Sequence, residues 1–335
     1  YKGEPSPPPP TKGQIQLCIG GWNNGFYLTN FNTKNNSLIN TRLINITKGN
    51  QNLPSYVINS EKSLYMSLED WWPQVKGRVI QIDKKSSIDE YKDYYDVNSQ
   101  LLVNDTGGIS PVFMEEKILQ NNKYLLIANI TKPGSSSSVY NFETKEINKI
   151  CLCVNNNEKN NCLEKSCIDC NDYYYDSPKG SICKGDSGNF IHQSLSIPDH
   201  IYKGSEIMGI YSICLSCNNR GNIFYSQLTT SGYTNIKTSY SFNENTGPRH
   251  MAFHPSKQYV YVISETSHEV FTFNINSDYT LVLEASHQII GSNGLTGAEI
   301  STVNYNNKDY LFYSMRSSTE NSENKIYCAD ITEGN

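Results

Sequence analysis

The sequence lacks several features that mark particular classes of protein. It has no run of five or more basic residues and a formal net charge of only -5 over 335 residues, so neither nucleic acid nor a membrane surface is indicated as the main partner. No apolar stretch approaches the roughly 18 residues of a membrane span, and no segment has the spacing of a long amphipathic helix. The 37% of hydrophobic residues still suffices for a packed core. We therefore expect a globular protein without a membrane span.

The chain also lacks an initiating methionine, because it begins at Tyr1. We expect either that a signal peptide has been removed or that the sequence is a fragment. Four Asn-X-Ser/Thr acceptor triplets are present, beginning at Asn35, Asn45, Asn104 and Asn129. Together with ten cysteines, an even number, these triplets predict a secreted, extracellular glycoprotein with disulfide bonds.

Six cysteines lie between residues 151 and 183, in a segment with little apolar material for a core of its own. The two Cys-X-X-Cys motifs, at 167/170 and 214/217, have a spacing that is compatible with Zn²⁺. The glycan acceptors and the irregular spacing of the other cysteines favour disulfides instead, so we predict no metal and no cofactor. The predicted disulfide-forming residues are Cys151, Cys153, Cys162, Cys167, Cys170, Cys183, Cys214 and Cys217.

Strand-like segments repeat along most of the chain. Residues 1–13 include a proline run and are expected to form an extended arm. From residue 14 to 335, a unit of about 50 residues recurs, with apolar strands separated by polar turns. Four-stranded antiparallel units without helical crossovers predict an all-β fold, a β-propeller of six to seven blades, interrupted by a Cys-rich insertion at 151–184. A β-sandwich or stacked meanders would not require such a regular unit length.

Charged residues occur at equivalent places in two successive units. From the position of the turns, we predict that Arg249 lies opposite Glu265, and Glu299 opposite Arg316. In a propeller, the inner strands line the central channel, so these four side chains should meet at one mouth of it. The alternative is a pair of ordinary cross-strand salt bridges, each worth about 0.2–1 kcal/mol.

Several hairpins resemble those of one known family. The segments GPRHMAFHPSKQYVYVISE, GGISPVFMEEKILQNNKYLLIANIT and GLTGAEISTVNYNNKDYLFYSMRS are similar to the lactonase-type seven-bladed propellers, which include 6-phosphogluconolactonase and carboxymuconate cyclase. The resemblance implies active-site roles for His192, Arg249, Glu265 and Arg316. Phe190 stands where the family has a second histidine. The implied chemistry is opening or closure of a lactone, in which the arginines hold a carboxylate or phosphate and Glu265 or His192 moves a proton.

Other unusual residues are predicted at the same face. Glu69, Trp71 and Trp72 follow the second strand of the second unit, and with Glu299 they are candidate ligand-binding residues. The tryptophans could equally be packing residues. The insertion at 151–184 is expected to enter at this face, where it either walls the pocket or only stabilises itself.

Two functions remain open from the sequence. The first is a secreted lactonase-type enzyme that acts on a small anionic or lactone ligand. The second is a non-catalytic extracellular protein that self-assembles, as an oligomer or filament, through its N-terminal arm and an incomplete ring. The ring is expected to be incomplete because the repeats end about one blade short of seven. Either the natural chain continues past Asn335, or six units close the ring, or a neighbouring molecule fills the gap.

Overall fold

The structure is a computed structural model, and it describes residues 13–20, 25–45, 54–60, 62–69, 77–86, 93–95, 101–103, 106, 108, 110–130, 136–150, 190–202, 206–217, 220–230, 232–291, 294–317 and 323–334. Regular structure in these residues consists of β-strands, without an α-helix. Within the same ranges there is accordingly no helix long and apolar enough to cross a membrane. The proline-rich arm (except Gly13) and the 151–184 insertion lie outside the described residues.

Consecutive strands of the described residues form six antiparallel sheets. The first sheet contains β1 (Gln14–Ile19), β2 (Gly25–Asn32) and β3 (Ser37–Asn45), and the second contains β4 (Pro54–Asn59), β5 (Ser63–Leu68), β6 (Arg78–Ser86), β7 (Asp93–Tyr95) and β8 (Leu101–Val103). The third contains β9 (Pro111–Leu119), β10 (Asn122–Asn129), β11 (Ser136–Asn141) and β12 (Ile147–Ile150), and the fourth contains β13 (Ile191–Ser196), β14 (Met208–Cys214), β15 (Asn222–Thr229) and β16 (Gly232–Ser241). The fifth contains β17 (Pro248–Phe253), β18 (Tyr259–Ser264), β19 (Glu269–Ile275) and β20 (Leu281–Gln288), and the sixth contains β21 (Leu295–Tyr305), β22 (Lys308–Ser317) and β23 (Lys325–Asp330).

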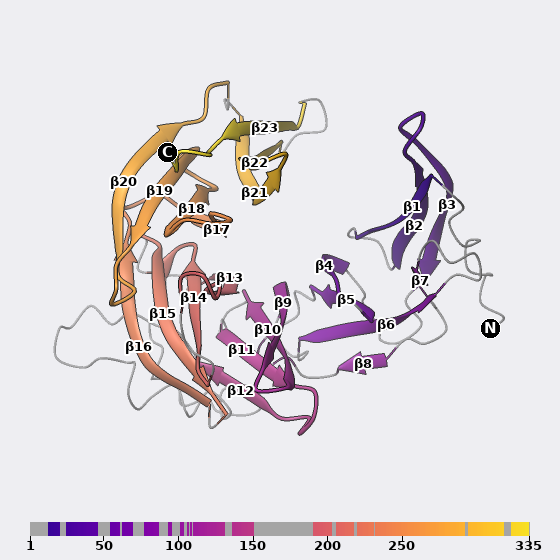
Figure 1. The fold of residues 1–335 in the computed structure, drawn as a ribbon, viewed down its shortest axis with the longest axis horizontal. Helices are drawn as coiled ribbons and strands as arrows, with labels where there is room; N and C mark the ends of the chain where they lie inside the picture. The colour runs from indigo at the N-terminus through magenta and orange to yellow at the C-terminus, as the bar shows by residue number, and fades with distance from the viewer. Residues whose placement is uncertain are drawn as a thin grey trace, which may run out of the picture.

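The sheets are arranged around a centre like the blades of a propeller (Figure 1). The first strands of the second to sixth sheets contact one another in sequence around that centre: β4 with β9, β9 with β13, β13 with β17, and β17 with β21. Strands β16 and β20 lie at the periphery, and the first and sixth sheets face each other across the open side of the ring (Figure 1). The predicted β-propeller is therefore confirmed.

Burial explains why the second strand is so apolar in the second to fifth sheets. Every residue of β14, with the sequence MGIYSIC, is buried, because this strand is covered on both faces by neighbouring sheets. The peripheral strand β16 is mostly exposed and carries polar residues. Between the fourth and fifth sheets, Tyr211, Phe253 and Phe273 join one core cluster. Each such aromatic side chain contributes roughly 1.5–3 kcal/mol when it leaves water, so blade-to-blade packing holds the ring together.

A two-residue turn sets the register of the sixth sheet. Asn306 and Asn307 both have positive φ, 51° and 61°, as the type I′ hairpin turn requires. Tyr305 therefore pairs with Lys308, and further along the hairpin Thr296 pairs with Arg316. The predicted pairing of Glu299 with Arg316 is wrong for two reasons: the turn lies about one residue earlier in the chain than predicted, and a bulge between Gly297 and Ile300 shifts the register by one more residue. In the structure, the backbone N–H of Glu299 donates a hydrogen bond to Ser314 Oγ at 3.0 Å.

Candidate active site at the channel mouth

The inner strands share an irregularity at the same end. In each of β4, β9, β13, β17 and β21, the pairing register with the next strand shifts close to the N-terminal end of the strand. Such β-bulges turn a side chain away from the regular alternation, and they are frequent beside active sites. The residues inside these five bulges are Ser55, Val112, His192, Arg249 and the pair Ala298 and Glu299.

One group of side chains at this level is the arginine–glutamate cluster, formed by Arg249, Glu265 and Arg316. Arg249 Nε lies 3.3 Å from Glu265 Oε2, so the predicted side-chain contact is confirmed. The predicted register is wrong, because Arg249 lies inside a bulge and the N–H of Glu265 bonds to the carbonyl oxygen of Gly247. Arg316 Nη2 donates a hydrogen bond of 3.0 Å to Glu265 Oε1. Arg316, which we expected beside Glu299, therefore pairs with the carboxylate of the neighbouring blade. Glu265 holds two guanidinium groups side by side.

A second group is the histidine relay, formed by Glu299, His250 and His192. Glu299 Oε1 lies 2.9 Å from His250 Nδ1, and His250 Nε2 lies 2.9 Å from His192 Nδ1. The relay crosses from β21 to β17 and from β17 to β13, so it joins three blades. His250 was not among the predicted site residues. Its position next to Arg249 could have indicated a role in the site. In a regular strand, however, adjacent side chains point to opposite faces, so the sequence pattern placed His250 away from Arg249.

The two groups meet at Arg249, which reaches towards both. Its Nη1 donates to the backbone carbonyl oxygen of Ala298, next to Glu299. Its Nε is buried and is not aligned for a hydrogen bond with Glu265, so this N–H has no acceptor among the described residues. A buried donor without a partner is unfavourable by about 1–3 kcal/mol. An oxygen atom of a bound ligand would satisfy it.

Burial and charge set the protonation states of the site. Burial, together with the charge of Arg316, lowers the pKa of Arg249 to about 10. Burial, followed by the charge of Arg249, lowers the pKa of His192 well below its usual range. Burial also lowers the pKa of His250. For Glu299, burial acts to raise the pKa, but His250 and the backbone N–H of Ile300 outweigh it, and the pKa is lowered. The relay is therefore a carboxylate followed by two neutral imidazoles.

Two glycines allow the neighbouring blades to approach at the site. A Cβ on Gly297 would meet the carbonyl oxygen of Ser264 at 2.0 Å, so only glycine fits between β21 and the end of β18. Gly247 has a φ of +63°, which favours glycine, and its carbonyl oxygen accepts a hydrogen bond of 2.7 Å from the N–H of Glu265. Both contacts hold the backbone on either side of Glu265.

The second and third blades supply the remaining wall. The rings of Phe113 and Tyr56 pack against His250, with ring centroids 5.6 and 6.4 Å apart. Glu69 is buried after β5, and burial raises its pKa against the charges of Arg249 and Arg316. The predicted residues Trp71 and Trp72 lie outside the described residues.

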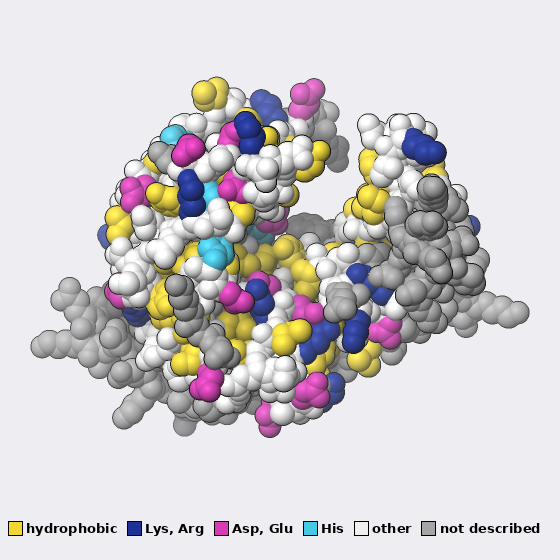
Figure 2. All heavy atoms as spheres, viewed as in Figure 1, with side chains coloured by type: hydrophobic (Ala, Val, Ile, Leu, Met, Phe, Trp, Pro, Cys, Tyr) yellow, Lys and Arg dark blue, Asp and Glu magenta, His cyan; other side chains and the backbone are white. Residues whose placement is uncertain are grey.

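The site is open on one side. Side-chain exposure falls from 48% at Arg316 to 26% at Glu265 and 12% at Arg249, and His192 is buried. In the space-filling view, basic, acidic and histidine side chains gather beside the central hollow (Figure 2). A small molecule could therefore meet the guanidinium groups first and the imidazole of His192 at greater depth.

The predicted disulfide and glycan residues have different outcomes. Cys214 and Cys217 form a disulfide, so this pair is confirmed, while the six cysteines between 151 and 183 lie outside the described residues. Among the acceptors, Asn35 is exposed in the turn after β2. Asn129 is fully buried, and its amide nitrogen donates to Thr106, Ser136 and Ser138; a glycan there is incompatible with this packing. Asn104 and the side chain of Asn45 are not described.

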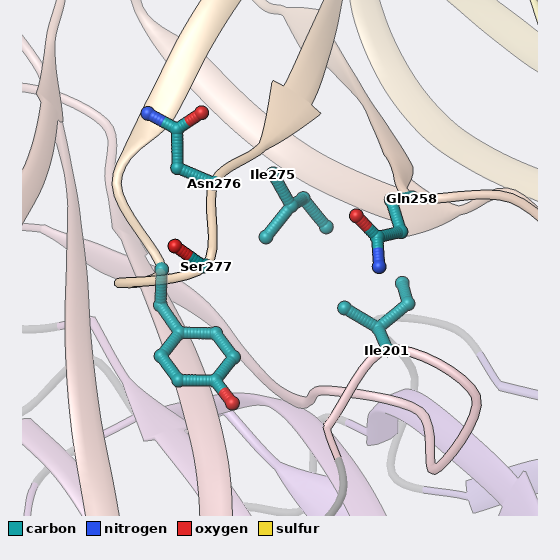
Figure 3. A pocket seen from close by; sticks show the side chains of 6 residues that line it. Ile201, Gln258, Ile275, Asn276 and Ser277 are labelled. Atoms are coloured by element: carbon teal, nitrogen blue, oxygen red, sulfur yellow. The ribbon is translucent and has the colours of Figure 1, made fainter.

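A separate pocket of about 280 Å³ lies at the opposite ends of the same strands, between the turns after β17 and β19 (Figure 3). Ile201, Ile275 and Tyr279 give it an apolar wall, and its polar groups belong to uncharged side chains of Gln258, Asn276 and Ser277. None of its lining residues belongs to the arginine–glutamate cluster or the histidine relay. This pocket is therefore separate from the charged groups at the channel mouth.

Comparisons with known proteins agree with this architecture. Residues 220–335 match the family described as lactonase, 7-bladed beta-propeller. The 6-phosphogluconolactonase of Bacillus subtilis is 32% identical over 85 residues, which are 25% of this chain and only 21% of that protein.

Solved structures show the same fold over nearly the whole chain. The periplasmic gluconolactonase PpgL of Pseudomonas aeruginosa is 12% identical with a TM-score of 0.58, covering 95% of this chain and 83% of its own. A candidate 6-phosphogluconolactonase from Bacteroides fragilis is 14% identical with a TM-score of 0.57, covering 99% and 81%. Identities this low establish the fold alone. Together with the match over residues 220–335, they agree with the resemblance to the lactonase-type propellers seen in the sequence.

Proposed function

We propose that the channel mouth binds a lactone and hydrolyses it. The observation that carries this proposal is the placement of two guanidinium groups, bridged by Glu265, beside a buried neutral imidazole. Ester hydrolysis needs a base that accepts a proton from water and donors that stabilise the oxyanion formed at the carbonyl. His192 supplies the base, and the two arginines supply the donors.

The reaction follows from these roles. A water molecule loses a proton to His192 while its oxygen bonds to the lactone carbonyl carbon. The negative charge that develops on the carbonyl oxygen is stabilised by the arginine side chains, of which Arg249 has an unused buried N–H. The ring C–O bond then breaks, and the leaving oxygen takes the proton from His192, which gives a hydroxy acid. Glu265 has both carboxylate oxygens next to guanidinium groups and therefore orients the arginines.

The test is hydrolysis of a lactone panel, including gluconolactone and 6-phosphogluconolactone, followed by acid release in a weakly buffered solution. Wild type should hydrolyse at least one lactone. Glu265→Gln should reduce kcat/KM by up to about 10²–10³-fold, the range for the loss of one oxyanion-stabilising donor, because the arginines that supply these donors lose the carboxylate that orients them. The matched control is Glu284→Gln, which removes an exposed carboxylate on β20. If wild type turns over no lactone, or if both variants keep wild-type activity, the proposal fails.

Secretion remains part of the proposal. The Cys214–Cys217 disulfide and the exposed acceptor Asn35 support an oxidising, extracellular location. Export and glycosylation are tested together by expression in a secretory host and mass spectrometry of the protein recovered from the medium.

A second candidate function is self-assembly without catalysis. Eight large apolar side chains are exposed on the two sheets that border the open side of the ring: Ile15, Ile19, Leu38, Leu43, Val303, Tyr305, Phe312 and Ile326. Exposed apolar surface on sheet edges and faces favours association. We propose that a second copy covers these faces with the help of the 1–13 arm. Light scattering of full-length protein and of a variant lacking residues 1–13 tests this; a monomeric full-length protein, or equal assembly of both, contradicts it.

A further inference from the structure

We infer that His250 and Glu299 are positioning residues that place the proton of His192 on Nδ1 and leave Nε2 as its basic nitrogen. This inference rests on the proposed function for its catalytic meaning. The arrangement of hydrogen atoms that it assigns can be measured without any substrate.

The assignment follows from counting donors and acceptors along the relay. Ionised Glu299 can only accept, so the proton between Glu299 Oε1 and His250 Nδ1, 2.9 Å apart, belongs to His250. A neutral imidazole carries one proton, so His250 Nε2 is an acceptor. The proton in the 2.9 Å contact between His250 Nε2 and His192 Nδ1 therefore belongs to His192. Nε2 of His192 is left with a free lone pair.

Surrounding groups keep the relay in this state. The backbone N–H of Ile300 donates to Glu299 Oε1 at 3.1 Å, which favours the carboxylate form. Positive charges face the imidazoles from two elements, with Arg249 on β17 and Arg316 on β22. These charges disfavour a second positive charge on either ring, while the carboxylate of Glu299 lies on the far side of His250 from His192.

Packing also prevents His250 from reversing its ring. Its side chain is only 2% exposed, and the aromatic rings of Tyr56 on β4 and Phe113 on β9 stand nearly perpendicular to it, at 88° and 73°. A ring flip would exchange carbon and nitrogen atoms at both ends and break both relay hydrogen bonds. Fixing the orientation of a base through a second residue is the same logic that makes a carboxylate orient the histidine of a hydrolase triad.

Two substitutions of His250 separate orientation from packing. In His250→Gln, the amide can donate to Glu299 through Nε2 and accept from His192 through Oε1. In His250→Phe, an aromatic ring of similar shape remains, but both hydrogen bonds are lost. The control is His287→Phe, which replaces an exposed histidine on β20.

The experiment is ¹⁵N NMR of imidazole-labelled protein at pH 7–8, combined with pH profiles of kcat/KM for the lactone that wild type hydrolyses. We expect wild-type His192 to be protonated at Nδ1, and we expect a mixture of tautomers in His250→Phe. That variant should lose at least 10-fold in kcat/KM, with its acidic limb moved along the pH axis, whereas His250→Gln retains more activity.

Wild-type His192 protonated at Nε2 overturns the inference. Equal tautomers and pH profiles in wild type and His250→Phe also overturn it. If no lactone is hydrolysed but the tautomers are as assigned, the proposed function fails while the hydrogen-bond assignment stands.

Discussion

Replacing Glu265 by Gln should destabilise the folded protein as well as the site. The substitution keeps the shape of the side chain but removes the only negative charge that contacts both Arg249 and Arg316 among the described residues. Arg249 is 12% exposed, so its ion pair with Glu265 is worth more than the roughly 0.2–1 kcal/mol of an exposed pair but less than the roughly 3–5 kcal/mol lost when a fully buried pair is broken. Arg316 is 48% exposed, so its contact is worth at most about 1 kcal/mol.

The sum predicts a loss of about 2–3 kcal/mol in the free energy of unfolding, because the Gln amide still offers one neutral acceptor. For domains of 150–250 residues this corresponds to a fall in Tm of roughly 4–12 °C. Urea denaturation followed by fluorescence measures it, with Glu284→Gln as the control. A further variant, Glu265→Gln with Arg316→Gln, should recover part of the loss, because the charge of Arg316 acts against that of Arg249.

A change below about 0.5 kcal/mol in Glu265→Gln, similar to an ordinary surface substitution, would refute the view that Glu265 neutralises a buried guanidinium. If the double variant loses more free energy of unfolding than the two single variants lose together, the two arginines do not repel each other in the site.

Three further predictions concern other parts of the molecule. Acidification from pH 7 to 5 should lower the free energy of unfolding, because the histidines of the relay have folded pKa values below the ordinary 6.5 and the unfolded chain therefore binds protons that the folded chain does not. The loss is at most about 1.4 kcal/mol per histidine per pH unit. Urea unfolding of wild type and His250→Phe at several pH values checks it. Reduction of the Cys214–Cys217 disulfide should remove roughly 2 kcal/mol, and peptide mapping without reductant should show the two cysteines linked. Protein secreted from a glycosylating host should carry no glycan on Asn129, which is fully buried; mass spectrometry that finds this residue occupied in folded protein would contradict the packing around it.

The repeated strands could be predicted because they follow from burial. A strand such as β14, covered on both faces, must be largely apolar, while the peripheral β16 is not, and β18 and β20 of the fifth sheet show the same contrast. The contact of Arg249 with Glu265 could also be predicted, since both residues belong to one short hairpin. Because the two residues are close together in the sequence, the hairpin must bring them close together in space.

The rest of the site depends on features that the hydrophobic pattern does not record. A bulge in β17 places Arg249 between two regular pairs, so Arg249 and His250 both take part in the site although they are adjacent. The turn at Asn306 and Asn307, together with the bulge between Gly297 and Ile300, makes Thr296 the partner of Arg316, and the Arg316 side chain reaches Glu265 of the neighbouring blade. A shift of one or two residues in register changes which charges meet, and the sequence alone did not locate it.

Apart from the contact between Arg249 and Glu265 within the fifth sheet, the contacts described for the candidate site run between blades. Arg316 of the sixth sheet reaches Glu265 of the fifth, Glu299 of the sixth reaches His250, and His250 reaches His192 of the fourth. No single blade contains a complete set of groups for the proposed reaction. The apolar clusters that join the fourth to the fifth sheet and the fifth to the sixth therefore position the functional groups as well as stabilise the fold. Because of this, a cavity made in either cluster should disturb the relay geometry before it unfolds the ring, since cores lose their exact arrangement before they lose their stability.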